Sequence, residues 1–157
     1  MSRDGAPPPR MCYGCGAENE YGLHAEFRRE GDRTVCDFTP VDFQQGYPGR
    51  MHGGIVSTLI DEAMGWAVYH SKKWGTTARL AVRYRRPVDM ARPLRIEAWI
   101  TNERRRLIEL RAEVRDESGQ LLADGEGTYM LLDPQTASML SALARHVGRE
   151  DAPEVVP

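Results

Sequence analysis

The 157-residue sequence has no apolar run approaching the ~20 residues that a membrane-spanning helix needs. Residues 1–9 also lack the apolar core of a signal peptide. The sequence also has no excess of positive charge. It contains 21 Lys and Arg residues and 23 Asp and Glu residues, which gives a formal net charge of −2. Proteins that bind nucleic acid usually present a cationic surface. We therefore expect neither a membrane nor nucleic acid as a partner.

Cysteine is scarce, with three residues in a chain without an export signal. An odd, small number of this kind predicts reduced thiols and a cytoplasmic location. Cys12 and Cys15 have the C-x-x-C spacing of some zinc and redox sites. Zinc would need two more ligands, and only His24 and Cys36 lie nearby, at irregular spacing. The pattern favours packed or exposed thiols, and we predict no metal.

The composition fits a single globular domain. Hydrophobic residues make up 41% and charged residues 28% of the chain, and two separate cores would each be marginal at this length. Proline, glycine and charge are concentrated at both ends. We predict flexible tails at residues 1–10 and 148–157 and one domain at residues 11–147.

The hydrophobic period changes along this domain. Alternation predicts a first hairpin within residues 23–38, helical spacing predicts a central helix around residues 55–68, and a short helix is expected at 136–147. Four longer strands are predicted at 79–85, 94–100, 108–114 and 121–132. The apolar positions of the central helix cover most of its circumference, so it should be buried on most sides. An α+β fold, with one antiparallel six-stranded sheet wrapped around that helix, achieves this burial.

The start of the central helix has features of a site for acyl transfer. Gly53 and Gly54 directly follow His52, and glycine lets a ligand approach the backbone closely. The first N–H groups of a helix point outward, where they can stabilise a carbonyl oxygen that becomes negative. A tight entry turn with no ligand explains the two glycines equally well.

Two carboxylates, Asp61 and Glu62, interrupt the apolar run from opposite flanks of the helix. A carboxylate beside buried residues costs free energy unless it is paired or solvated, so solvated edge residues or an ion pair with arginine also explain them. Ser57 lies one and a half turns beyond His52 but has no evident orienting acid, which argues against a serine hydrolase.

Several motifs, in the same order, resemble one protein family. They are CYGCG…GL at 12–23, QGYPG at 45–49, HGG…D at 52–61 and TARL…YRRP at 77–87. Together they are similar to hotdog-fold acyl-CoA thioesterases of the PaaI-like branch, especially the Gln-Gly-x-Pro-Gly group that includes mitochondrial long-chain acyl-CoA thioesterases. The resemblance implies a hotdog fold and the hydrolysis of acyl-CoA to free acid and coenzyme A, without a cofactor.

The resemblance also implies roles for single residues. Asp61 would act as general base or nucleophile, and Thr77 would assist the attacking water. The Gly53 N–H would polarise the thioester carbonyl, with His52 shaping the same loop. In this family the site lies between two subunits, so Asp61 and Thr77 of one copy would face Gly53 of another. A homodimer, or a homotetramer made of two dimers, is therefore expected.

Five residues are predicted to contact the substrate. Many relatives have an asparagine where this chain has the glycine after Gln45, so Gln45 is expected to supply the amide. Gly54 and Glu62 adjoin the central residues of the motif. Arg85 and Arg86 lie near a strand end and suit coenzyme A phosphates, although a solvated sheet face explains most arginines here.

Two other functions remain open from the sequence. A hotdog hydratase or dehydratase would act on enoyl or hydroxyacyl thioesters with a histidine as acid and base. A non-catalytic acyl-CoA-binding module would have little use for Asp61 beside an electrophile. Steady release of free thiol from a saturated acyl-CoA separates hydrolysis from both. Residue spacing does not determine the length of the acyl group.

Overall fold

The computed structural model describes residues 10–150 and 152–154. Its elements are β1 (Arg28–Glu30), β2 (Arg33–Phe38), η1 (Asp42–Gln44), α1 (Gly53–His70), β3 (Gly75–Tyr84), β4 (Leu94–Arg104), β5 (Leu107–Asp116), β6 (Leu121–Leu131) and α2 (Pro134–His146). Among the described residues, no helix is long and apolar enough to cross a membrane.

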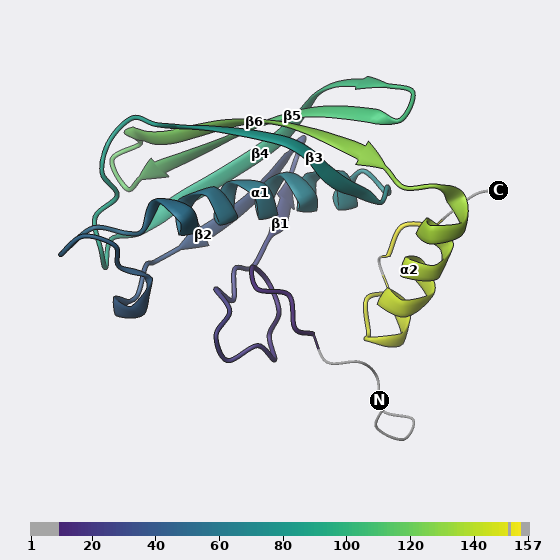
Figure 1. Cartoon of the computed structure of the whole chain (residues 1–157), viewed down its shortest axis with the longest axis horizontal. Coiled ribbons are helices and arrows are strands. Elements are labelled where there is room, and N and C mark those ends of the chain that lie inside the picture. Colours follow the sequence, from purple (N-terminus) through teal and green to yellow (C-terminus); the bar gives the residue numbers. More distant parts are fainter. Residues whose placement is uncertain (1–9, 151, 155–157) are drawn as a thin grey trace.

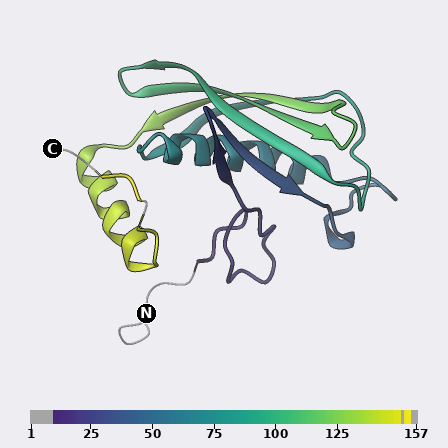
Figure 2. The same ribbon diagram turned by 180° about the vertical axis from the view of Figure 1, so that it is seen from behind.

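All six strands form one antiparallel sheet in the order β1-β2-β4-β5-β6-β3. The sheet curves over α1, which lies along its inner face (Figures 1 and 2). The predicted arrangement of six strands around one central helix is confirmed. Strand β3 follows α1 in the chain but lies at one edge of the sheet, beside β6.

The central helix is buried because its apolar residues face the sheet. Leu59, Ile60 and Met64 are completely buried, and burial of each contributes roughly 1.5–3 kcal/mol. The helix also approaches the sheet backbone closely at Gly127 of β6, where an added Cβ would lie 2.5 Å from the sulfur of Met64. Helix α1 is thereby held directly on β6, and this contact positions the side chains that the helix carries.

The first hairpin is shorter than predicted. Strand β1 begins only at Arg28, whereas the alternation of buried and exposed residues begins at Leu23. The backbone N–H of Leu23 donates to the carbonyl of Tyr13 at 2.7 Å, and that of Ala25 donates to the carbonyl of Gly14 at 2.9 Å. These residues therefore anchor the preceding loop instead of pairing with β2.

The two predicted tails differ in how much of them is described. Residues 1–9 lie outside the described residues. Part of the segment 148–157 packs back on the domain, because the Ser141 hydroxyl of α2 donates to the carbonyl of Pro153 at 2.6 Å and Pro153 is buried. The domain limits 11–147 stay a prediction.

Candidate functional site

Asp61 lies in the third turn of α1 and is held by two hydroxyl groups. Thr77, near the start of β3, donates to Asp61 Oδ1 at 2.8 Å. Tyr129 of β6 donates to the same oxygen at 2.6 Å and contacts the Asp61 carbonyl at 2.7 Å. Burial and the hydrogen bond to Asp61 raise the pKa of Tyr129, so this hydroxyl keeps its proton and remains a donor. The carboxylate is thus oriented through one of its two oxygens.

Tyr129 was not among the residues predicted from the sequence. It lies on the same buried face of β6 as Gly125 and Gly127, and this face is directed toward α1. A buried tyrosine usually finds a hydrogen-bond partner for its hydroxyl. A tyrosine on the inner face of the last strand was therefore the available signal, but the sequence did not reveal which polar group would meet it.

The start of α1 is built around His52. Its Nδ1 accepts a hydrogen bond from the Gly54 N–H at 2.9 Å, so His52 is the N-cap of the helix. The backbone N–H of His52 donates to the carbonyl of Gln44 at 2.9 Å, which fixes the entering chain. Gly53 is the first residue of the helix, where a backbone N–H has no acceptor within the helix itself.

One chain does not bring Gly53 and Asp61 together. They are eight residues apart on α1, which corresponds to about 12 Å along the helix axis at the usual rise per residue. A carbonyl group that reaches Asp61 therefore lies more than two turns from the Gly53 N–H of the same chain. Thr77, in contrast, contacts Asp61 directly.

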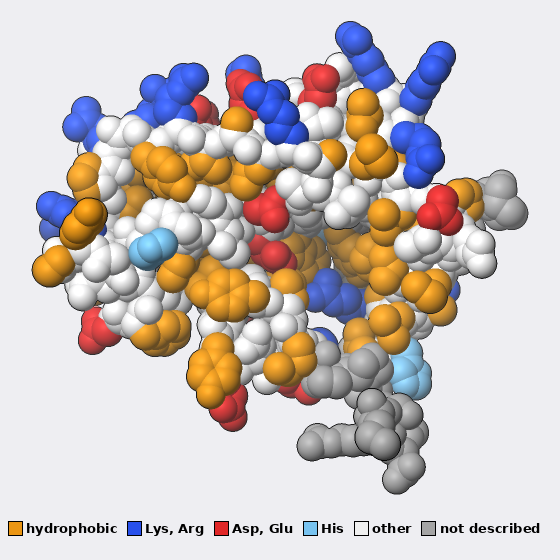
Figure 3. Space-filling model, viewed as in Figure 1, with side chains coloured by type: hydrophobic (Ala, Val, Ile, Leu, Met, Phe, Trp, Pro, Cys, Tyr) orange, Lys and Arg blue, Asp and Glu red, His pale blue; other side chains and the backbone are white. Residues whose placement is uncertain are grey.

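A cavity of about 290 Å³ adjoins Asp61. Figure 3 shows this face of the molecule hollowed beside α2, with hydrophobic side chains inside. Its lining combines the two carboxylates of α1, aromatic rings and cations: Cys15, Asp61, Glu62, Gly65, Trp66, Tyr69, Lys73, Trp74, Gly75, Thr76, Thr77, Tyr129 and Arg149. The aromatic rings can accept an apolar or aryl acyl group next to the carboxylate.

The other predicted substrate contacts lie outside this lining, except for Glu62. Gln45 accepts a hydrogen bond from the Gly49 N–H at 2.6 Å and so braces its own loop. Arg85 is ion-paired with Asp124 of β6, while Arg86 is exposed just beyond the end of β3.

Glu62 faces a different side of α1 from Asp61. Oε1 of its carboxyl group lies 3.4 Å from the Cys12 sulfur, within hydrogen-bond distance. Burial is the main cause that raises the pKa of Glu62 to about 7. The pKa of Cys12 is lowered to about 5, chiefly by a hydrogen bond from the Cys15 side chain.

Residues 48–123 match the sequence model of the thioesterase superfamily. The acyl-coenzyme A thioesterase THEM4 of Bos taurus is 30% identical over 126 residues, which are 78% of this chain and 52% of that protein. THEM4 of Xenopus laevis is 28% identical over 90 residues, 57% of this chain and 40% of that protein. The chain thus spans about half the length, or less, of these curated relatives.

Solved structures show the same fold. A crystal structure of a thioesterase superfamily protein superposes with a TM-score of 0.71 and 29% identity, over 73% of this chain and 60% of that one. A hypothetical thioesterase of Streptococcus pneumoniae, solved with coenzyme A, superposes with a TM-score of 0.65 and 19% identity, over 68% of this chain and 87% of that one. The PaaI protein of E. coli superposes with a TM-score of 0.66 and 15% identity, over 71% of this chain and 81% of that one. The predicted hotdog fold is confirmed.

Proposed function

The chain belongs to the thioesterase superfamily, and from this premise we propose that it hydrolyses acyl-CoA thioesters to a free acid and coenzyme A. The observation that carries the proposal is the Asp61 carboxylate, oriented by the hydroxyls of Thr77 and Tyr129 beside a cavity with aromatic walls. The curated relatives named as acyl-coenzyme A thioesterases support this reaction class. The substrate is already activated as a thioester, so the proposed reaction needs no cofactor.

In the proposed reaction, Asp61 accepts a proton from a water molecule as the water oxygen attacks the thioester carbonyl. The carbonyl oxygen becomes an oxyanion, which a Gly53 N–H stabilises. Collapse of this intermediate breaks the C–S bond, and the leaving thiolate of coenzyme A takes up the proton that Asp61 had accepted. A positioned base contributes ~10²–10⁴ in rate, and one oxyanion donor ~10²–10³. Direct attack by Asp61 on the carbonyl is the other route open to the same carboxylate.

The Gly53 N–H of this reaction is proposed to come from a second copy of the chain. The separation of about 12 Å between Gly53 and Asp61 along α1 argues against a site within one chain. Strand β3 is ten residues long, lies at the sheet edge, and is exposed from Thr76 to Arg79. A long exposed edge favours pairing with another strand, and two-fold symmetry would give two equivalent sites. We propose a homodimer, or a homotetramer built from it.

Two finer assignments rest on the sequence. Arg85 and Arg86 are proposed to contact the phosphates of coenzyme A, with the exposed Arg86 the more accessible of the two because Arg85 is paired with Asp124. A cytoplasmic location stays a prediction.

The proposed reaction is tested by measuring thiol release from short, medium, long and aryl acyl-CoA esters. We expect steady release of free coenzyme A from at least one saturated ester, because hydrolysis needs no double bond or hydroxyl group. Binding without thiol release would indicate an acyl-CoA-binding module instead. Hydration of an enoyl-CoA without thiol release would indicate a hydratase.

The Thr77 hydroxyl provides a second test. Thr77→Ala should lower kcat by roughly 10- to 100-fold, because a hydrogen bond to a charged group contributes ~1.5–3 kcal/mol. Thr77→Ser keeps the hydroxyl and should retain most of the activity. The side chain is exposed, so both variants should fold normally, which thermal unfolding can check. Equal losses in the two variants would mean that the methyl group, not the hydroxyl, matters at this position.

A further inference from the structure

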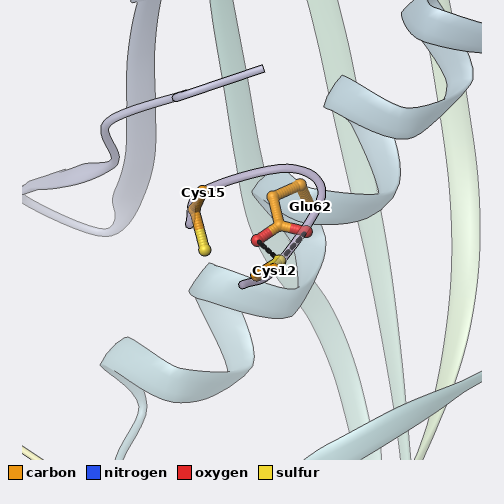
Figure 4. A group of neighbouring side chains, drawn as sticks. All are labelled: Cys12, Cys15 and Glu62. Atoms are coloured by element: carbon orange, nitrogen blue, oxygen red, sulfur yellow. Dashed lines mark hydrogen bonds between the residues drawn. The ribbon is translucent and has the colours of Figure 1, made fainter. Parts of the chain in front are cut away.

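Three side chains with metal-binding atoms meet beside α1 (Figure 4). Cys12 and Cys15 belong to the loop before β1, and Glu62 belongs to α1. One ligand atom from each residue lies within 4.8 Å of the other two. Cys12 Sγ is 3.4 Å from Glu62 Oε1 and 3.7 Å from Oε2. The sequence alone offered His24 and Cys36 as further ligands, whereas the fold brings Glu62 to the two thiols.

The spacing of these atoms fits a tetrahedral zinc ion. With usual bond lengths to thiolate and carboxylate, a sulfur and an oxygen on the same ion are about 3.6 Å apart. The two contacts of Cys12 with the carboxylate, at 3.4 and 3.7 Å, bracket this value. Two thiolates and a carboxylate are also ligands that zinc accepts.

The loop that carries the two cysteines is built closely onto Glu62. An added Cβ at Gly14 would lie 2.6 Å from the Glu62 carboxylate, so only glycine fits there without displacing it. The pairing of Tyr13 and Gly14 with residues after the loop holds it in place.

The surrounding charge also suits a cation with three anionic ligands. A divalent ion with two thiolates and one carboxylate has a net charge of −1. The guanidinium of Arg149 lies 3.9 Å from the Cys15 sulfur and can offset this charge. Cys15 and Glu62 line the cavity beside Asp61, so a fourth position on the ion would open toward water in that cavity.

We propose that Cys12, Cys15 and Glu62 bind one zinc ion, with a water molecule from the cavity as the fourth ligand. The ion connects the loop before β1 to α1, one residue from Asp61. Its role is to hold this loop against the helix that carries the carboxylate. The inference does not depend on the proposed hydrolysis, because its test measures metal binding directly.

The test is a titration of the reduced, metal-free protein with Co²⁺, which replaces Zn²⁺ and absorbs light. We expect one Co²⁺ per chain, a thiolate-to-cobalt charge-transfer band in the near ultraviolet, and loss of this band when Zn²⁺ is added. Cys12→Ser and Cys15→Ser should each abolish tight binding. Glu62→Gln should weaken binding at least ~10-fold, the lower limit for loss of an outer-shell partner.

Cys36→Ala is the matched control, because Cys36 is the one remaining cysteine and lies buried in the core, outside the cluster. It should bind Co²⁺ as the unchanged chain does. Circular dichroism checks that each variant folds, and the milder Glu62→Gln keeps the test decisive if a cysteine variant does not. A charge-transfer band that survives in both serine variants would overturn the proposal. So would an unchanged chain that binds no Co²⁺ but readily forms a Cys12–Cys15 disulfide, since the pair would then be a redox pair.

Discussion

Asp61→Asn is expected to lower kcat by ~10²–10⁴, the range for loss of a positioned general base. The amide has nearly the same size as the carboxylate, and its oxygen can still accept the hydrogen bonds from Thr77 and Tyr129. The geometry of the site should therefore survive while the ability to take up a proton is lost. Steady-state thiol release measures the effect, and thermal unfolding checks that the variant stays folded.

Two other variants define what this result means. Asp32→Asn changes a highly exposed carboxylate in the turn between β1 and β2 and should leave kcat unchanged. Glu62→Gln changes the neighbour of Asp61 and should reduce kcat much less than Asp61→Asn does, because Glu62 faces Cys12. If Glu62→Gln proves the more damaging of the two, the assignment of the catalytic carboxylate is wrong.

The secondary structure could be predicted from the sequence because its signals are local. The apolar spacing within residues 55–68 is a property of one helix, and the structure extends that helix only to Gly53 and His70. The first hairpin was predicted too long for a related reason. Alternation at Leu23 and Ala25 reports which side chains are buried, but it does not report which backbone groups pair.

The contacts around the site could not be predicted in the same way, because they join distant parts of the chain. Tyr129 is 68 residues from Asp61, and Cys12 is 50 residues from Glu62. No spacing rule connects such pairs, and only the order of the strands brings them together. The proposed role of Asp61 came from family resemblance, and the fold adds the two hydroxyls that orient it.

A second large effect is expected at Gly53. Gly53→Pro removes the N–H proposed to stabilise the oxyanion and should lower kcat by ~10²–10³. Proline is well tolerated at the first position of a helix, and the extended backbone of His52, with φ −66° and ψ 131°, suits a residue before proline. Gly53→Ala keeps the N–H, and its Cβ would meet the Tyr84 ring at an ordinary 3.5 Å. The alanine variant should therefore lose far less activity, and comparable losses would point to steric blockage instead.

The most direct test of the central claim is to co-express Asp61→Asn with Gly53→Pro and measure thiol release from the purified mixture. In a mixed dimer, one site would contain both changes and the other neither. Random pairing should then restore up to about one quarter of the original activity, since half of the dimers are mixed and each has one intact site. Separately expressed variants should stay nearly inactive. A co-expressed mixture with no more activity than the single variants, despite mixed dimers, would contradict a site shared between two copies, as would a fully active monomer in light scattering.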